Sequence, residues 1–165
     1  MLFRSGRAAE ALAAIGSRED APAIGQMVAR HLRDGALAGI EPDDLRPSIG
    51  PPVEAVRLGL FALARLAATD TITGVVLNAD GSPVSRWWPV AFTLGRASSP
   101  AATQALRALI DTPGRYTSAF AIQALGRLRS TEAAGTLRTL VEQRQRDVAV
   151  VVEAVRALEI GRAHV

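Results

Sequence analysis

The sequence contains no cysteine, no lysine, two histidines and one tyrosine. The lack of cysteine excludes disulfide bonds and thiolate metal sites, and two histidines leave almost nothing for a histidine-based zinc site or catalytic dyad. No apolar run approaches the roughly 20 residues that span a bilayer. We therefore expect no membrane segment, no bound metal and no cofactor.

Arginine supplies all 19 basic residues, against 16 acidic residues, so the formal charge is only +3. The isoelectric point of about 10.8 reflects this use of arginine more than an excess of charge. Because long-range attraction to a phosphate backbone depends on charge, the basic isoelectric point alone is weak evidence for nucleic-acid binding. Hydrophobic residues form 48% of the 165 residues, which is enough for the core of one domain.

Both ends of the chain resemble translations of a DNA adaptor used in short-read sequencing libraries. One adaptor strand encodes residues 160–165 followed by a stop codon, and its complement encodes a start codon followed by residues 2–5. We therefore expect 1–5 and 160–165 to be non-native tails, and 6–159 to be an internal fragment of a longer protein. Without the two arginines in these tails, the basic excess nearly disappears.

The segment 116–141 has the pattern of two consecutive helices joined by a short break at 129–130. The same pattern recurs along the chain at intervals of 51, 31, 31 and 30 residues, and a period in this range is typical of a solenoid. When the repeats are aligned with one another, large and small apolar residues recur at fixed positions, which we call columns. This is expected where each helical pair packs on the next. The aligned position is occupied by Ala13, Ala64, Gly95, Gly126 and Arg156.

Turn residues support this alignment. Asp20, Ser99 and Ser130 stand where second helices are expected to start, and each side chain is suited to accept a hydrogen bond from a first-turn amide. Pro113-Gly114 separates the third unit from the fourth. We predict four helical pairs and a half pair, with the limits 6–33, 51–81, 82–113, 114–145 and 146–159.

The columns 8–12 (Ala-Ala-Glu-Ala-Leu) and 124–128 (Ala-Leu-Gly-Arg-Leu) resemble the short HEAT-like repeats of the bacterial HEAT and phycobilisome-lyase-like group. The resemblance covers nearly all of 6–159. It implies an all-α fold, a right-handed α-solenoid of HEAT-like helical pairs. It specifies function weakly, because this repeat serves scaffolds, inhibitors, lyases and chaperone-like proteins. Our first hypothesis is a non-catalytic protein–protein interaction scaffold.

Two alternatives stay open. HEAT-like folds also occur in DNA glycosylases and bilin lyases, but the glycosylase chemistry needs a carboxylate beside exposed aromatic residues on a basic concave face, and here acids and aromatics fall on different faces. A nucleic-acid-binding array is suggested by Arg107 and Arg138 on second helices. Since neither an aromatic platform nor a glycine-rich phosphate loop accompanies that pair, we expect a protein partner rather than nucleic acid.

Residues 34–50, rich in glycine, proline and aspartate, exceed the repeat period and are predicted to form an inserted loop. The loop is either functional or simply tolerated on one face of the array. Asp43 and Asp44 lack the spaced oxygen ligands of a calcium site, so we interpret them as chance neighbours. We expect His31 to be partly exposed near a helix C-terminus.

Two further segments depart from the repeat. Residues 71–76 are β-branched and suit a strand by local propensity, yet we predict a helix because Val75 falls in register. The last unit, 146–159, lacks its second helix. Its apolar face should therefore be uncovered, and we expect the fragment to self-associate through it.

One face of the first helices carries aromatic residues flanked by arginines, the usual chemistry of interface hot spots. Alternatively, the aromatic rings fill the grooves between repeats and the arginines form a solvated ladder. Trp87 lies in an otherwise small or apolar column and is assigned to the core. The candidate partner-binding residues are Arg57, Phe61, Arg65, Trp88, Phe92, Arg96, Tyr116 and Arg127.

Overall fold

The computed structural model describes residues 2–46, 50–128, 131–142 and 147–162. Helices account for most of these residues, and none of the described segments forms a β-strand. In chain order the elements are α1 (Leu2–Ile15), the short 3-10 helix η1 (Arg18–Asp20), α2 (Ala21–Arg33), α3 (Pro51–Arg65), α4 (Thr69–Val76), α5 (Trp88–Leu94), α6 (Pro100–Ile110), α7 (Tyr116–Leu128), α8 (Thr131–Glu142) and α9 (Val148–Arg162).

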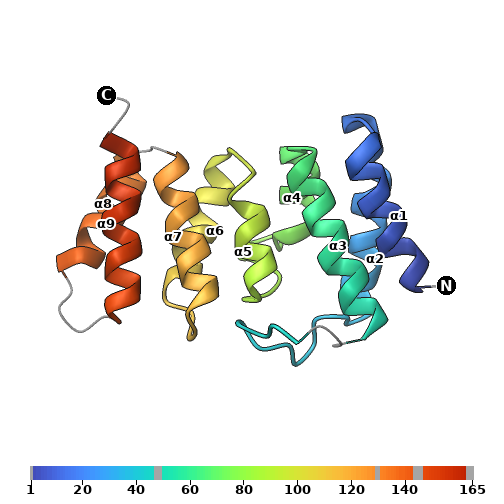
Figure 1. Cartoon of the computed structure of the whole chain (residues 1–165), viewed down its shortest axis with the longest axis horizontal. Coiled ribbons are helices and arrows are strands. Elements are labelled where there is room, and N and C mark those ends of the chain that lie inside the picture. Colours follow the sequence, from blue (N-terminus) through green and yellow to red (C-terminus); the bar gives the residue numbers. More distant parts are fainter. Residues whose placement is uncertain (1, 47–49, 129–130, 143–146, 163–165) are drawn as a thin grey trace.

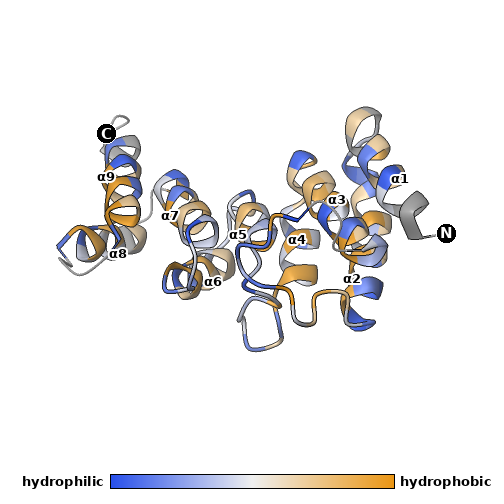
Figure 2. Ribbon diagram, turned by 60° about the horizontal axis from the view of Figure 1, so that its bottom comes forward, coloured by the Kyte–Doolittle hydropathy of each residue, from blue (hydrophilic) through white to orange (hydrophobic). Residues whose placement is uncertain are grey.

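The helices form two layers that run from one end of the chain to the other (Figure 1). The helices α1, α3, α5, α7 and α9 pack in series in the first layer. The second helix of each pair lies in the other layer, and apolar residues concentrate between the two (Figure 2). This arrangement of four pairs and a half pair confirms the predicted all-α solenoid. No described helix has the length and apolar character needed to cross a membrane.

The predicted apolar columns supply the core. Leu63, Leu94 and Leu125 are fully buried at the same position of successive first helices. Residues 71–76 lie in α4, so the prediction of a helix there is confirmed. The register within α4 differs, however: Ile72 is fully buried, whereas Val75 is only half-buried. Thus the helical period, and not the β propensity, decides this segment once it packs against its neighbours.

The column that aligns the repeats is small because first helices cross there. A Cβ atom added to Gly126 would lie 2.7 Å from the Ala157 Cβ and 2.8 Å from its Cα. A Cβ atom on Gly95 would lie 2.7 Å from the Ala124 Cβ. The crossings of α7 with α9 and of α5 with α7 therefore depend on glycine.

Replacing Gly126 by alanine should destabilise the protein by about 1–2 kcal/mol, although alanine is the better helix former by about 1 kcal/mol. The added methyl group meets backbone atoms of α9, so the two helices must separate. Gly135 in α8 provides the matched control, because a Cβ atom there would have no neighbour within 4 Å. Gly135→Ala should raise the midpoint of urea unfolding, and a rise for both variants would contradict the close crossing.

Helix caps agree with the sequence in one of two testable cases. The Ser99 hydroxyl accepts a hydrogen bond from the Ala102 amide (3.1 Å), as predicted. Asp20 stands at the N-cap position of α2 as predicted, but its side chain does not accept the predicted hydrogen bond from a first-turn amide of that helix. Its carboxylate instead accepts from the Ser17 amide (2.9 Å), while the Ser17 hydroxyl accepts from the Glu19 amide (3.2 Å). The cap stands earlier because η1 precedes α2, and Ser130 lies outside the described residues.

Part of each predicted tail belongs to a terminal helix. The helix α1 begins at Leu2, and α9 ends at Arg162. Met1 and residues 163–165 lie outside the described part of the chain. The adaptor origin of both ends and the limits of the single repeats stay predictions.

Candidate functional site

Four aromatic rings from three successive repeats form a closed cycle on the outer side of the first layer. The Phe61 ring centroid lies 5.9 Å from that of Trp88 and 5.4 Å from that of Phe92. Phe120 completes the cycle, stacking on Trp88 (5.5 Å) and meeting Phe92 edge to face (5.6 Å). Each such pair contributes about 0.5–1.5 kcal/mol beyond the burial of its area. The rings therefore connect α3, α5 and α7.

These rings also line an open pocket of about 530 Å³, which we call the aromatic groove. All four rings are half-buried, so each packs on its neighbours and still presents surface to solvent. Arg65 and Arg96 are exposed at the groove, and the Arg96 guanidinium carbon lies 5.5 Å from the Phe92 ring centroid. The lining residues are Phe61, Ala64, Arg65, Trp88, Phe92, Arg96 and Phe120.

The structure brings five of the eight predicted partner-binding residues into the aromatic groove. The other three lie elsewhere. Arg57 forms an ion pair with Glu54 (2.8 Å), Tyr116 is exposed at the start of α7, and Arg127 is exposed near the end of that helix. The two interpretations of the aromatic residues thus both hold in part, because the rings fill the space between repeats and also line an open surface.

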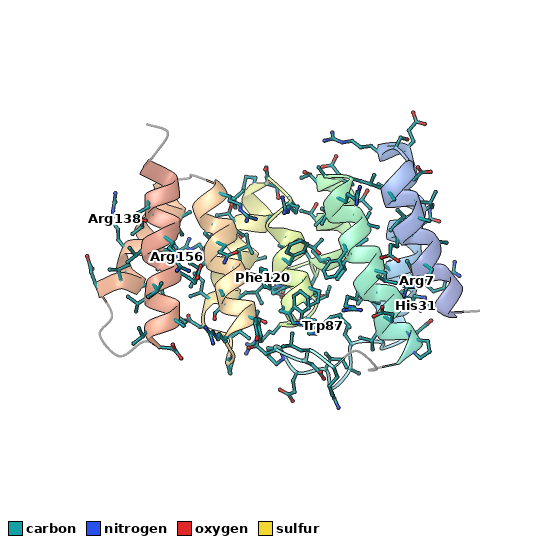
Figure 3. All side chains as sticks on the ribbon, in the orientation of Figure 1. Arg7, His31, Trp87, Phe120, Arg138 and Arg156 are labelled. Atoms are coloured by element: carbon teal, nitrogen blue, oxygen red, sulfur yellow. The ribbon has the colours of Figure 1, made fainter. Side chains whose placement is uncertain are left out.

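Sequence reasoning missed Phe120, which lies between α7 and α5 (Figure 3). It stands four residues after Tyr116, which was among the predicted partner-binding residues. Residues at this spacing are neighbours on a helix surface. The signal was therefore present, one column away from the chosen stripe.

The inserted segment acts as a strap, defined here as residues 34–46, that runs below α3 and α5 (Figure 1). The Pro42 carbonyl accepts a hydrogen bond from the Trp88 amide at the start of α5 (2.8 Å). The Asp44 carbonyl accepts from the indole N–H groups of both Trp87 (3.0 Å) and Trp88 (3.1 Å). The insertion is therefore not merely tolerated, because it supplies the acceptors that two buried or half-buried indoles require.

Asp43 connects the strap to α7. Its carboxylate accepts hydrogen bonds from the amides of Arg115, Tyr116 (2.9 Å) and Thr117 (3.1 Å). An N-terminal cap from a residue 72 positions earlier satisfies unpaired amides and places negative charge at the positive end of the helix. Gly114 has a φ of 117°, and a Cβ there would lie 2.6 Å from the Asp43 carboxyl carbon. The predicted break at 113–114 thus also makes room for the cap.

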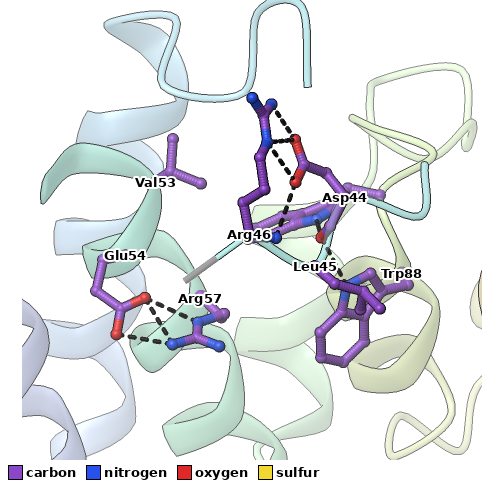
Figure 4. A pocket seen from close by; sticks show the side chains of 8 residues that line it. Asp44, Leu45, Arg46, Val53, Glu54, Arg57 and Trp88 are labelled. Atoms are coloured by element: carbon purple, nitrogen blue, oxygen red, sulfur yellow. Dashed lines mark hydrogen bonds and ion pairs between the residues drawn. The ribbon is translucent and has the colours of Figure 1, made fainter. Parts of the chain in front are cut away.

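Asp44 and Arg46 form a local pair at the end of the strap (Figure 4). The Arg46 side chain and amide donate to the Asp44 carboxylate, and these hydrogen bonds lower the pKa of that carboxyl. The two adjacent carboxylates therefore have separate structural partners, Asp43 at the start of α7 and Asp44 at Arg46. The space beside Trp87 and Trp88 measures about 10 Å³, room for roughly one water molecule, so this junction is packed.

Four other predicted residues have clear positions. Trp87 is 1% exposed, which confirms its place in the core. His31 is 5% exposed, so the prediction of partial exposure was wrong; it lies on the face of α2 that also carries Val28 into the core. Arg107 and Arg138 are exposed on α6 and α8, in the layer opposite the aromatic groove.

The helix α9 exposes valines at helical spacing. Val148 is 76% exposed, and Val152 and Val155 are each 40% exposed. They lie four and three residues apart and share a helix face. The half pair thus has an apolar face that no described residue covers, and self-association through it stays a prediction.

Among the described residues, no group of three or more histidine, aspartate and glutamate side chains is placed to hold a metal ion. The family model of HEAT repeats matches residues 74–159, from the end of α4 into α9. The match includes Trp88, Phe92 and Phe120 of the aromatic groove, but not Phe61. Neither a curated protein nor a solved structure matches the chain. Since the matched segment covers just over half of the sequence and successive helical pairs precede α9, this chain belongs to the HEAT-repeat family.

Proposed function

We propose that this chain is a non-catalytic protein–protein interaction scaffold and that the aromatic groove is its partner-binding site. HEAT repeats commonly serve as such scaffolds, which supports the general class. The observation that carries the specific site is the cycle of four half-buried rings with two exposed arginines on its edge. Aromatic residues and arginine dominate the binding energy of protein interfaces.

The groove is suited to binding because its position is fixed before any partner arrives. Three first helices carry the rings, the ring-to-ring contacts hold them together, and the strap fixes the Trp88 indole through the Asp44 carbonyl. A partner therefore has to order few groups of this chain, and preordered surfaces lose less free energy on binding. None of the described residues that line the groove carries a carboxylate, so this surface gives the glycosylase alternative no support.

The test uses the whole chain as bait for a displayed library of random peptides. We expect selected peptides to lose about 30-fold or more in affinity when Phe61 and Phe92 are both replaced by alanine, because each ring is expected to act as a hot spot. Circular dichroism would verify that the variant stays folded. A second variant with leucine at both positions keeps most of the apolar volume of the two side chains. A loss of peptide affinity in this variant would therefore not be caused by unfolding.

Tyr116→Ala is the matched control. Tyr116 is 42% exposed and does not line the groove, so its replacement removes an aromatic side chain without changing the proposed site. We expect selected peptides to bind this variant as they bind the wild type. Equal binding to the folded Phe61/Phe92 variants, or equal losses with Tyr116→Ala, would show that the groove is not the binding site.

A further inference from the structure

The aromatic groove is bordered by a row of arginines that continues beyond it. Arg65 ends α3, Arg96 follows the last turn of α5, and Arg127 lies in the last turn of α7. All three are exposed at the same position of successive repeats. In the described part of the chain, none of them forms an ion pair with another residue. The row therefore presents three positive charges that no carboxylate of the described chain neutralises.

The row and the rings together indicate two features of a partner. The described residues that line the groove are apolar or aromatic, except for the two charged side chains of Arg65 and Arg96. The Arg96 guanidinium lies over the Phe92 ring, which restricts its orientation. A partner that fits must place apolar groups on the rings and carboxylates beside the guanidinium groups, because arginine pairs most strongly with planar anions.

The aromatic rings also indicate the conformation of that partner. Aromatic-lined grooves are surfaces on which proline-rich segments dock, because polyproline II is largely formed before binding.

We propose that the aromatic groove binds an extended acidic segment of a protein partner, in polyproline II conformation. The carboxylates pair with Arg65, Arg96 and Arg127 while the intervening residues pack on Phe61, Trp88, Phe92 and Phe120. This inference rests on the proposed function and adds the chemistry and the conformation of the partner to it.

The probe is a fluorescein-labelled peptide of five Pro-Pro-Glu units, and its binding to the whole chain is measured by fluorescence anisotropy. We expect binding that weakens as salt increases, because screening reduces the attraction between exposed charges. The peptide with glutamine in place of glutamate should have an affinity at least about tenfold lower.

Single variants locate the contact on the protein. Arg96→Gln should weaken binding of the Pro-Pro-Glu peptide about tenfold, whereas Arg138→Gln, on the opposite layer, should leave it unchanged. Equal effects of the two variants, or equal affinity for the glutamate and the glutamine peptides, would overturn the proposal. So would tighter binding of a dT12 oligonucleotide with the same dependence on Arg96, since aromatic rings with arginine also bind single-stranded nucleic acid.

The failure of this inference and that of the proposed function are distinguishable. If library-selected or glutamine peptides bind with a dependence on Phe61 and Phe92 but without a preference for glutamate, the groove is a protein-binding site and the acidic segment is wrong. If no peptide of either kind depends on these two rings, the groove is not a binding site and both proposals fail.

Discussion

Replacing Leu125 by aspartate is expected to unfold at least the last two repeats. Leu125 is 0% exposed in α7, and α7 packs against α5, α6, α8 and α9. A carboxylate there has no room for water and no cationic partner among the buried residues, so we expect a loss of about 4 kcal/mol or more. Because each repeat is stabilised chiefly by its neighbours, the loss should spread along the array.

The measurement is thermal and urea unfolding followed by circular dichroism. Val148→Asp provides the control, because Val148 is 76% exposed on α9 and the same new charge stays in water. We expect this variant to change the free energy of unfolding by no more than about 0.5 kcal/mol. A nearly unchanged melting temperature for Leu125→Asp would show that the helical register assigned to α7 is wrong.

Replacing Asp43 by alanine is expected to release the strap from α7. The carboxylate accepts three backbone amides at the start of that helix, and alanine leaves all three without this acceptor. Loss of an N-terminal cap commonly lowers stability by about 1 kcal/mol, and hydrogen bonds to a charged group add to this, so we expect about 2 kcal/mol or more.

The two tryptophans report the same event independently. Both indole N–H groups donate to the Asp44 carbonyl, so movement of the strap should expose them and shift their fluorescence emission to longer wavelength. Asp44→Ala is the matched control. It removes a carboxylate whose partner among the described residues is Arg46, and it keeps the backbone carbonyl that accepts from the two indoles. We expect emission close to that of the wild type for Asp44→Ala. Equal effects of the two replacements would contradict the capping role of Asp43.

The strap also relates the fold to the candidate site. Trp88 donates to the strap through its indole and stacks on Phe120 within the groove. Asp43 fixes the start of α7, the helix that carries Phe120. The segment that departs from the repeat is therefore the one that connects the first pair of helices to the helices of the groove.

The repeat, the all-α class and most of the core residues could be predicted from the sequence alone. These features follow from periodicity, because a helix that packs on one side must repeat its apolar residues at about 3.6-residue spacing. The burial of Leu63, Leu94 and Leu125, the helix at 71–76 and the core position of Trp87 were all predictable on this ground. The glycines at the aligned position, Gly95 and Gly126, are explained by the close crossings of α5 with α7 and of α7 with α9.

The contacts between side chains of different repeats depend on tertiary packing and could not be predicted from the sequence. The cap that Asp43 provides joins residues 72 positions apart, and no local pattern encodes the acceptor that a distant helix will use. Phe120 lies in the groove because α7 packs against α5, and His31 is buried where α2 packs against its neighbours. Periodicity fixes the face of a helix, whereas the partner of each side chain depends on how the helices and the strap pack in three dimensions.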